Sequence, residues 1–271
     1  MKIILCKLHF DQSMTGEIKL VSTDFDGTLF TEFEKPPIPV RLQRLIAELQ
    51  TRGAKWVVNT GRDMSGLMEA LGRANASVQP DFVVLVEREI YMRDGTRYVS
   101  HTEWNDKCTR LHHELFDRIR PDLPGLAAWI TSRFKATVYE DAYSPLCLLA
   151  GNNGDADKIH EFLEQYARTV PGLTVVRNDV YARFSHEAYS KGTALAEISR
   201  LLRLEPEHVF AVGDHLNDLP MLKLEFARWL AAPANAIEQV KHAVLNQNGY
   251  VATHPHGNGV AEALEFYLAA R

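Results

Sequence analysis

Two aspartates stand two residues apart where a strand is predicted to end. The β-prone run from Ile18 to Thr23 is followed by Asp24 and Asp26, and then Gly27 and Thr28 break the strand. Residues i and i+2 of an extended chain point to the same side, so the two carboxylates lie close together at the strand tip. Such a pair attracts a hard, oxygen-seeking cation such as Mg²⁺. An aspartate-rich turn after a strand would look the same, so the rest of the chain must decide.

Further polar groups stand at other predicted element ends. They are Thr60 after the run Lys55 to Asn59, Lys191 at the start of a helix, and Asp214, Asn217 and Asp218 after the run His208 to Val212. In an open parallel α/β sheet, ligands bind at the C-terminal edge of the strands, so we expect these groups to converge there. Four carboxylates, a hydroxyl and a lysine fit phosphoryl transfer, which needs an oxygen nucleophile, a proton carrier and nearby cations.

The elements that must position these groups alternate between strand and helix. From residue 18 to residue 86 the order is β-α-β-α-β, which predicts a parallel sheet with right-handed crossovers. After the first strand, apolar residues at helical spacing predict a helix from Val40 to Leu49 with Gly53 as its stop, and another helix carries Met64 to Leu71. Asp81 to Val86 is the third strand.

The pattern changes at Glu87. The predicted elements are a hairpin over Ile90 to Ser100 around Asp94-Gly95, helices over Asp106 to Ile119 and Leu126 to Phe134, a strand over Leu146 to Ala150, a helix capped by Asp155, and a strand pair over Leu173 to Val176 and Val180 to Phe184. This block is as long as a separate α/β domain. We therefore predict an inserted domain over residues 87–186 and a core formed by residues 1–86 and 187–271.

The parallel-sheet pattern returns near Ser190. A helix over Thr193 to Leu202 leads to the strand that precedes Asp214, and Phe226 to Ala231 is a further strand. Asn235 with Glu238 fits a helix cap. The chain ends with an apolar helix after Gly259. The predicted fold class is thus α/β, with a Rossmann-like parallel sheet split by the insert.

At this point the chain resembles the haloacid dehalogenase superfamily of phosphatases, over about residues 18 to 271. Its four motifs occur in order: Asp24-Phe25-Asp26-Gly27-Thr28, Thr60-Gly61-Arg62, Lys191-Gly192, and Gly213-Asp214-His215-Leu216-Asn217-Asp218. The large insert resembles the α/β cap of the Cof-like sugar-phosphatase branch. Pro233-Ala234-Asn235-Ala236 and Gly257-Asn258-Gly259-Val260-Ala261 resemble the C-terminal segments of that branch.

The resemblance implies a Mg²⁺-dependent phosphatase that acts through an aspartyl-phosphate. Asp24 would attack phosphorus, and Asp26 would protonate the leaving alcohol and then activate water. Thr60, Gly61 and Lys191 would bind the phosphoryl group, with Thr60 and Lys191 also counted as catalytic. The metal would be held by Asp24, by Asp26 through its carbonyl, and by Asp214 and Asp218. The substrate would be a small phosphorylated metabolite such as a sugar phosphate.

Some roles stay open in the sequence. Glu87-Arg88-Glu89 stands where the family often has an Asn-Gly pair, so substrate contacts there do not transfer. Arg62 is interpreted as a substrate contact or a surface cap, and Asn217 as a metal-positioning group or a turn former. His215 is expected to be a loop residue, since Mg²⁺ prefers oxygen. His254 and His256 are expected to be loop residues near the mouth of the site.

Composition narrows the function classes. The chain has 271 residues and a formal net charge of −5, which gives no electrostatic basis for nucleic-acid or membrane-surface binding. No apolar run is long enough to span a bilayer. Cys6, Cys108 and Cys147 form neither a metal motif nor a disulfide framework, which suits a cytoplasmic location. Residues 1–16 are expected to be a short strand or loose arm, with Met14 as an alternative start. Nothing indicates the oligomeric state.

Two alternatives to hydrolysis remain. A phosphotransferase or phosphomutase on the same scaffold would pass the phosphoryl group to a second alcohol instead of water. A binding or regulatory protein could keep the fold without turnover, although the intact pair of Asp24 and Asp26 argues against it. Product analysis with excess acceptor alcohol separates the first alternative, and hydrolysis of an aryl phosphate excludes the second.

Overall fold

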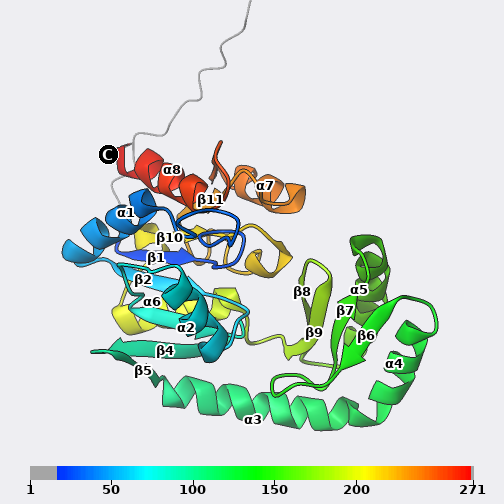
Figure 1. The fold of residues 1–271 in the computed structure, drawn as a ribbon. Helices are drawn as coiled ribbons and strands as arrows, with labels where there is room; N and C mark the ends of the chain where they lie inside the picture. Colours follow the sequence, from blue (N-terminus) through cyan, green and yellow to red (C-terminus); the bar gives the residue numbers. More distant parts are fainter. Residues whose placement is uncertain (1–16, 270–271) are drawn as a thin grey trace, which may run out of the picture.

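The computed structural model describes residues 17–269 and contains two β-sheets (Figure 1). The expectations for residues 1–16, for Met14 and for Cys6 lie outside the described residues. The larger sheet has eight strands in the order β12-β11-β10-β1-β2-β3-β4-β5. Its strands are β1 (Leu20–Thr23), β2 (Lys55–Asn59), β3 (Phe82–Leu85), β4 (Glu89–Asp94), β5 (Arg97–Ser100), β10 (Val209–Val212), β11 (Trp229–Ala232) and β12 (Tyr250–Val251).

Six neighbouring strands of this sheet, from β12 to β3, pair in parallel. The five strands from β11 to β3 are buried along almost their whole length and are mostly apolar, as expected for strands covered on both faces. The chain segments on either side of the insert therefore build one sheet, with β1 between β10 and β2. The predicted fold class, a Rossmann-like α/β core with an inserted domain, is confirmed.

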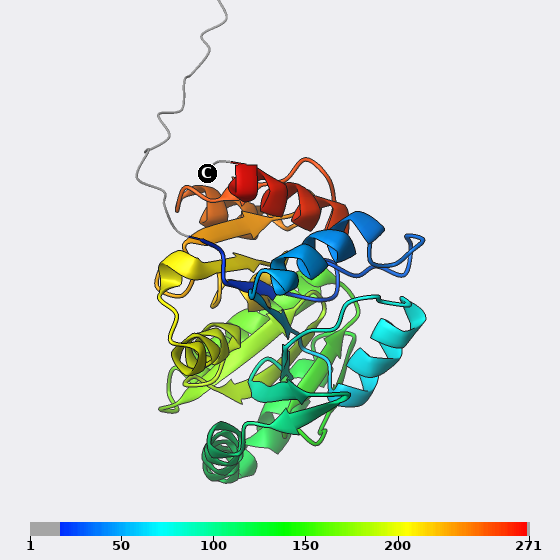
Figure 2. The ribbon, with the colours of Figure 1, turned by 90° about the vertical axis from the view of Figure 1, so that its left-hand side faces the viewer.

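Helices cover both faces of the core sheet (Figure 2). The helices α1 (Val40–Thr51), α2 (Met64–Arg73) and α8 (His256–Ala269) pack on one face, where Ile46, Leu67 and Leu264 are buried. The helices α6 (Lys191–Leu202) and α7 (Glu238–Leu245) pack on the other face, through Leu195 and Val240. The periodicity that predicted these helices thus reflects the two hydrophobic layers of the core.

The hairpin formed by β4 and β5 belongs to the core sheet. β4 pairs antiparallel with β3, and Leu85 lies opposite Glu89. The edge of β3 offers backbone groups that need partners, and the hairpin satisfies them. The sequence analysis placed this hairpin in the insert. We propose instead that the insert begins after Ser100 and ends near His186.

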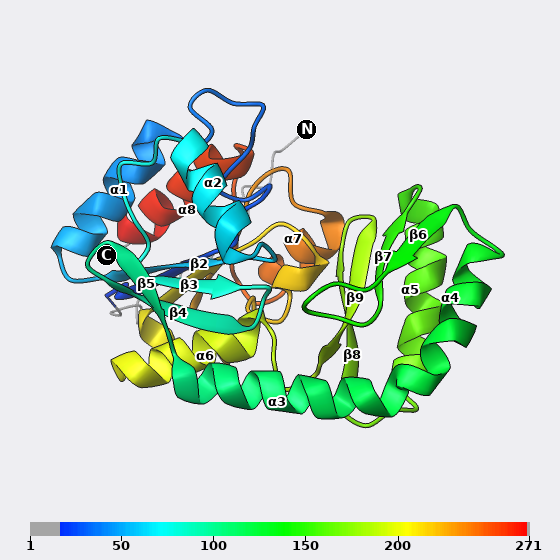
Figure 3. The ribbon, with the colours of Figure 1, turned by 60° about the horizontal axis from the view of Figure 1, so that its bottom comes forward.

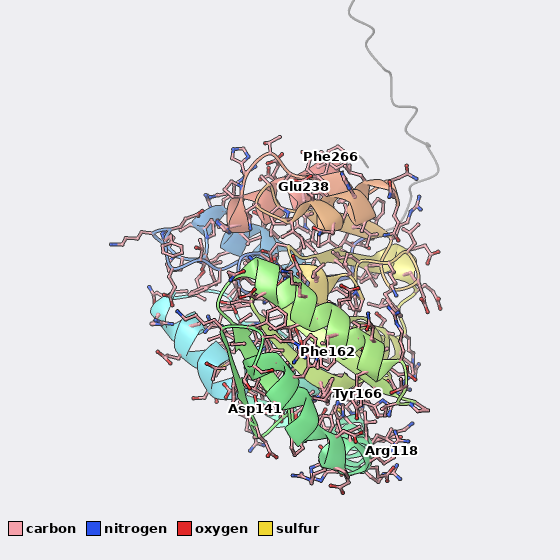
Figure 4. The ribbon with its side chains drawn as sticks, turned by 90° about the vertical axis from the view of Figure 1, so that its right-hand side faces the viewer. Arg118, Asp141, Phe162, Tyr166, Glu238 and Phe266 are labelled. Atoms are coloured by element: carbon pink, nitrogen blue, oxygen red, sulfur yellow. The ribbon has the colours of Figure 1, made fainter. Side chains whose placement is uncertain are left out.

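The insert has its own antiparallel sheet in the order β6-β7-β9-β8. Its elements are α3 (Thr102–Ile119), η1 (Arg120–Asp122), α4 (Leu123–Thr131), β6 (Ala136–Tyr139), β7 (Cys147–Ala150), α5 (Asn153–Ala167), β8 (Leu173–Asn178) and β9 (Tyr181–His186). Figure 4 shows Phe162 and Tyr166 of α5 beside α4. Phe162 stacks on Trp129 with ring centroids 3.7 Å apart, and the Tyr166 hydroxyl donates to Asp122 at 2.7 Å.

Three local expectations differ from the structure. α3 begins at Thr102, four residues before its predicted start, and the helix cap of α5 is Asn152 instead of Asp155. The short strands β6 and β12 were not predicted, because each is stabilised by its neighbour in the sheet more than by its own residues. Within residues 17–269, no helix has the length and apolar character needed to cross a membrane.

Candidate active site

Three carboxylates meet at the C-terminal edge of the core sheet. Asp24 follows β1, and Asp214 and Asp218 follow the neighbouring parallel strand β10. Ligand oxygens of the three side chains all lie within 4.8 Å of one another. Hard oxygen donors at this spacing fit a divalent cation such as Mg²⁺. The structure therefore brings together three of the four residues predicted for the metal.

Lys191 is buried between two of these carboxylates. Its Nζ donates to Oδ1 of Asp24 and to Oδ1 of Asp218, each at 2.6 Å, and the residue is 1% exposed. Burial by itself would lower the pKa of Lys191, but the charges of Asp218 and Asp24 raise it well above its usual value. Lys191 is the first residue of α6, and the Ser190 capping box fixes that helix start.

Asp218 is fully engaged by its surroundings. Its Oδ1 accepts the bond from Lys191, and its Oδ2 accepts the backbone N–H groups of Asp214 at 2.8 Å and His215 at 2.9 Å. These bonds favour a supporting role for Asp218, which shapes the loop and orients Lys191. Oxygens of Asp24 and Asp214 are more available for a metal, although Oδ1 of Asp214 also accepts the Thr28 hydroxyl at 2.8 Å.

The carboxylates repel one another in this buried setting. Burial, reinforced by the charge of Asp218, raises the pKa of Asp24 well above its usual range, although Lys191 opposes this. Burial and Asp218 also raise the pKa of Asp214 to about 6. A cation bound among the three would relieve this repulsion, so the electrostatics agree with the ligand chemistry.

Asp26 does not join the acidic cluster. Its carboxylate forms a bidentate ion pair with Arg62, with Nε to Oδ2 at 2.7 Å and Nη2 to Oδ1 at 2.6 Å. The guanidinium lies 5.4 Å from the ring centre of Phe25 and 5.6 Å from that of Phe30. Arg62 therefore holds Asp26 in this structure, a role that neither interpretation of Arg62 from the sequence included.

The segment after β2 supplies the predicted phosphate-binding groups. Thr60 is 1% exposed, and its hydroxyl accepts the backbone N–H of Arg62 at 3.1 Å. A Cβ atom at Gly61 would lie 3.5 Å from a carboxylate oxygen of Glu87. Glu87 therefore places a carboxylate beside this segment, and the sequence analysis did not identify it as part of the site.

The loop that carries Asp26 is held from the C-terminal half of the chain. Asn235 was predicted to cap a helix, but α7 follows Ile237 without a side-chain cap. The Asn235 amide instead donates to the Gly27 carbonyl at 2.8 Å and lies 3.4 Å from Oδ2 of Asp214. Gly27 has φ +76°, and a Cβ there would lie 2.5 Å from Oδ2 of Asp214, so any other residue would strain the backbone and push the Asp214 carboxylate aside.

The histidines near the site make loop contacts. His256 Nδ1 lies 2.9 Å from the Gly27 carbonyl, and His254 pairs with Glu262 at 2.7 Å. His215 Nδ1 accepts the backbone N–H of Asp179 at 3.3 Å. His215 and His254 are loop residues, as expected, whereas His256 is the first residue of α8.

The insert faces the edge of the sheet that carries these residues (Figure 3). Besides the contact of Asp179 with His215, Arg88 Nη2 donates to the Tyr143 carbonyl at 2.8 Å, and Arg183 of β9 pairs with Glu87 at 3.0 Å. A cavity of about 540 Å³ lies between the two parts. It is lined by Lys191 and Asn217 of the core and by residues 174–177 of β8. It reaches the carboxylate cluster through Lys191, and neither Asp24 nor Asp214 lines it.

Comparisons with known proteins agree with this architecture. Residues 132–264 match the haloacid dehalogenase-like hydrolase family. The Bacillus subtilis (strain 168) protein YxeH is 26% identical over 276 residues, which cover 93% of this chain and 99% of YxeH. From the same organism, 5-amino-6-(5-phospho-D-ribitylamino)uracil phosphatase YcsE is 24% identical and covers 93% of this chain and 96% of YcsE. A solved structure similar to this one is the sucrose-phosphatase from Synechocystis sp. PCC6803 in complex with sucrose and phosphate. The two structures superpose with a TM-score of 0.69 at 17% sequence identity, and the match covers 93% of this chain and 98% of the sucrose-phosphatase chain.

The fold and the four motifs together define a class of phosphoryl-transfer enzyme. The chain is similar to the haloacid dehalogenase-like hydrolases in its fold and over residues 132–264, and it is a phosphatase. The predicted resemblance to this family and the predicted enzyme class are therefore confirmed.

Proposed function

We propose that this phosphatase hydrolyses a small organic phosphomonoester, such as a sugar phosphate, with Mg²⁺ and through an aspartyl-phosphate at Asp24. One observation carries the proposal: Lys191 is buried between Asp24 and Asp218, with Asp214 beside them at the meeting ends of β1 and β10. The ammonium group of Lys191 and the proposed nucleophile Asp24 are thus held together where a phosphoryl group could bind.

The metal would be held by the carboxylates of Asp24 and Asp214 and by the carbonyl of Asp26, with Asp218 supporting the loop. When bound, a divalent cation offsets negative charge on the transferring phosphoryl group. Lys191 adds a second positive charge as a point donor, and Thr60 and Gly61 orient the phosphoryl oxygens.

Two displacements at phosphorus complete the reaction. An oxygen of Asp24 attacks phosphorus, the ester P–O bond breaks, and Asp26 gives a proton to the leaving oxygen. Water then gives a proton to Asp26 and attacks phosphorus, which releases inorganic phosphate and the Asp24 carboxylate. Because Asp26 is paired with Arg62 in this structure, it must leave that ion pair to reach the leaving group.

The phosphate ester is the only feature that we assign to the substrate from the core residues. The relatives carry names with chemically different leaving groups, sucrose in one and a ribitylaminouracil in another. We therefore place selectivity in the face of the insert that lines the cleft. Two buried free cysteines, Cys108 and Cys147, support a cytoplasmic location for the enzyme.

Hydrolysis of an aryl phosphate by purified protein tests the proposal. We expect turnover with Mg²⁺, loss of turnover on chelation, and recovery when Mg²⁺ is added back. Asp24→Asn should fold normally and lose detectable turnover, and Asp26→Asn should lose most with poor leaving groups, because general-acid catalysis typically contributes about 10²- to 10⁴-fold. Activity of wild-type size in Asp24→Asn, or in a well-dialysed sample with chelator, would contradict the proposal.

A further inference from the structure

Glu87 is held beside the predicted phosphate-binding segment by a strained turn. Val86 has φ +44° and Glu87 has φ +65°, a region that β-branched residues rarely adopt. The turn is fastened to the segment after β2, because Val86 N donates to the Arg62 carbonyl at 3.0 Å and Glu87 N donates to the Thr60 carbonyl at 2.9 Å. Such strain persists only where the surrounding structure enforces it, and it is often found at functional sites.

The Glu87 carboxylate is buried and bound from two sides. It is 6% exposed; Oε1 accepts the Asn217 amide at 2.8 Å and Oε2 accepts Nη2 of Arg183 at 3.0 Å. Arg183 is 3% exposed and also donates to the Val86 carbonyl. Glu87 and Asn217 belong to the core, whereas Arg183 stands on β9 of the insert. The insert therefore provides the countercharge for an acidic group of the core.

This ion pair is not arranged for stability alone. Among the described residues, Nε of Arg183 and Oδ1 of Asn217 have no hydrogen-bond partner although both atoms are buried. Desolvation of a buried ion pair typically cancels much of its Coulomb attraction, and incomplete hydrogen bonding weakens it further. A neutral pair of side chains would fit the same place at less cost, so the two charges indicate a role at the site.

Glu87 adds negative charge where a phosphoryl group is expected to bind. Gly61 and Lys191 are its neighbours, and the charge of Glu87 contributes to the raised pKa of Lys191. Asp24, Asp214 and Asp218 already crowd this region around a single lysine. Charges in a buried site interact far more strongly than in water, so an uncompensated Glu87 would repel an incoming phosphate.

We propose that Arg183 cancels the charge of Glu87 and thereby couples closure of the insert to phosphate binding at the core. The idea rests on the proposed phosphatase function and concerns two positioning residues. With the insert seated, the pair is neutral and the phosphoryl site accepts an anion. With the insert displaced, Glu87 stands unpaired beside Gly61 and disfavours the anion. Substrate is then held tightly only in the closed, water-excluding form of the enzyme.

The test measures the dissociation constant of inorganic phosphate by calorimetry, together with KM and kcat for an aryl phosphate. Arg183→Met leaves Glu87 uncompensated and should weaken phosphate at least about tenfold, equivalent to about 1.4 kcal/mol. Glu87→Gln/Arg183→Met removes both charges and should return phosphate affinity to within about threefold of wild type. Arg118→Met is the control: Arg118 of α3 donates to the Pro171 carbonyl at 2.7 Å within the insert and does not line the cavity. This control should bind phosphate within about threefold of wild type.

Arg183→Lys and Arg183→Gln provide the same comparison if Arg183→Met does not fold. The lysine variant keeps the charge and should bind phosphate well, and the glutamine variant should not. The inference is overturned if Arg183→Gln and Arg183→Met bind phosphate like wild type, or if the double variant remains as weak as Arg183→Met. Absence of both hydrolysis and phosphate binding in the wild type would instead refute the proposed function itself.

Discussion

At the scale of single residues, Lys191 compensates the negative charge of the buried carboxylates Asp24 and Asp218. It is the one cation within hydrogen-bonding distance of Asp24 and Asp218 among the described residues. Removing one partner of a buried ion pair leaves the other charges uncompensated, which typically costs about 3–5 kcal/mol. Lys191 thus serves folding as well as the proposed chemistry.

Lys191→Met should therefore lower the free energy of unfolding by about 3 kcal/mol in urea titrations with chelator. Lys241→Met is the control, because Lys241 pairs with Glu238 at 3.0 Å near the surface and should contribute less than about 1 kcal/mol. Equal losses in the two variants would show that the buried cation is not what stabilises the cluster.

The raised pKa of Asp214 makes the metal-free protein sensitive to pH. The folded form holds its proton up to about pH 6, whereas the ordinary value is 3.8, so between these values the folded state binds more protons than the unfolded state. Stability must then fall as pH rises through this window. Melting temperatures in chelator should fall more steeply from pH 4 to pH 7 for wild type than for Asp214→Asn. Parallel slopes would contradict the assignment.

The sequence predicted the acidic cluster because its members stand at strand ends. Parallel pairing of β1 with β10 makes their C-terminal ends meet, so Asp24 and Asp214 converge there. Asp218 joins them because the loop after β10 turns back and its carboxylate accepts the backbone N–H groups of Asp214 and His215. The contacts of Glu87 with Arg183, and of Asn235 with Gly27, could not be predicted in this way. They join loops or strands far apart in the chain and depend on side-chain directions that no local pattern specifies.

At the scale of elements, α6 is packed so closely that one methyl group matters. A Cβ at Gly192 would lie 2.2 Å from the Pro220 carbonyl oxygen, and backbone cannot move aside as a side chain can. This contact sets how near α6, and with it Lys191, lies to the loop after β10.

Gly192→Ala should lower stability by about 1–3 kcal/mol and reduce turnover, because overpacking shifts the helix that carries Lys191. Gly72→Ala in α2 is the control, since nothing lies within 4 Å of its added methyl group. Alanine has the better helix propensity, so that variant should gain up to about 1 kcal/mol in urea unfolding. A Gly192→Ala protein as stable and active as Gly72→Ala would disprove the packing argument.

Element positions followed from sequence wherever local signals were strong. β2 occurs at its predicted residues, and α1 ends just before Gly53, which has φ +94°. The hairpin was recognised as a hairpin, but its place was not, since the partner of β4 is chosen by the exposed edge of β3. Pairing between strands is a property of the assembled sheet, and an isolated segment carries little information about it.

At the scale of the whole molecule, two parts share one cleft. The core contributes Lys191 and Asn217 to the cavity, and the insert contributes the opposite wall through residues 174–177 of β8. Replacing the insert with that of a relative should therefore change the order in which phosphate esters are preferred, while dependence on Asp24 and Mg²⁺ persists. Ranking a panel of esters by kcat/KM measures this. An unchanged ranking in a folded, active chimera would place selectivity in the core.

The central claim is that Asp24 carries the phosphoryl group during turnover. The most direct measurement is rapid quenching of the enzyme with substrate, followed by borohydride reduction and mass spectrometry of the peptide that contains residue 24. An acyl phosphate is reduced to an alcohol, whereas a free carboxylate is not, so the account predicts homoserine at position 24 in wild type. Asp24→Asn should show no reduced product. Reduction at another carboxylate, or at none during active turnover, would contradict the account.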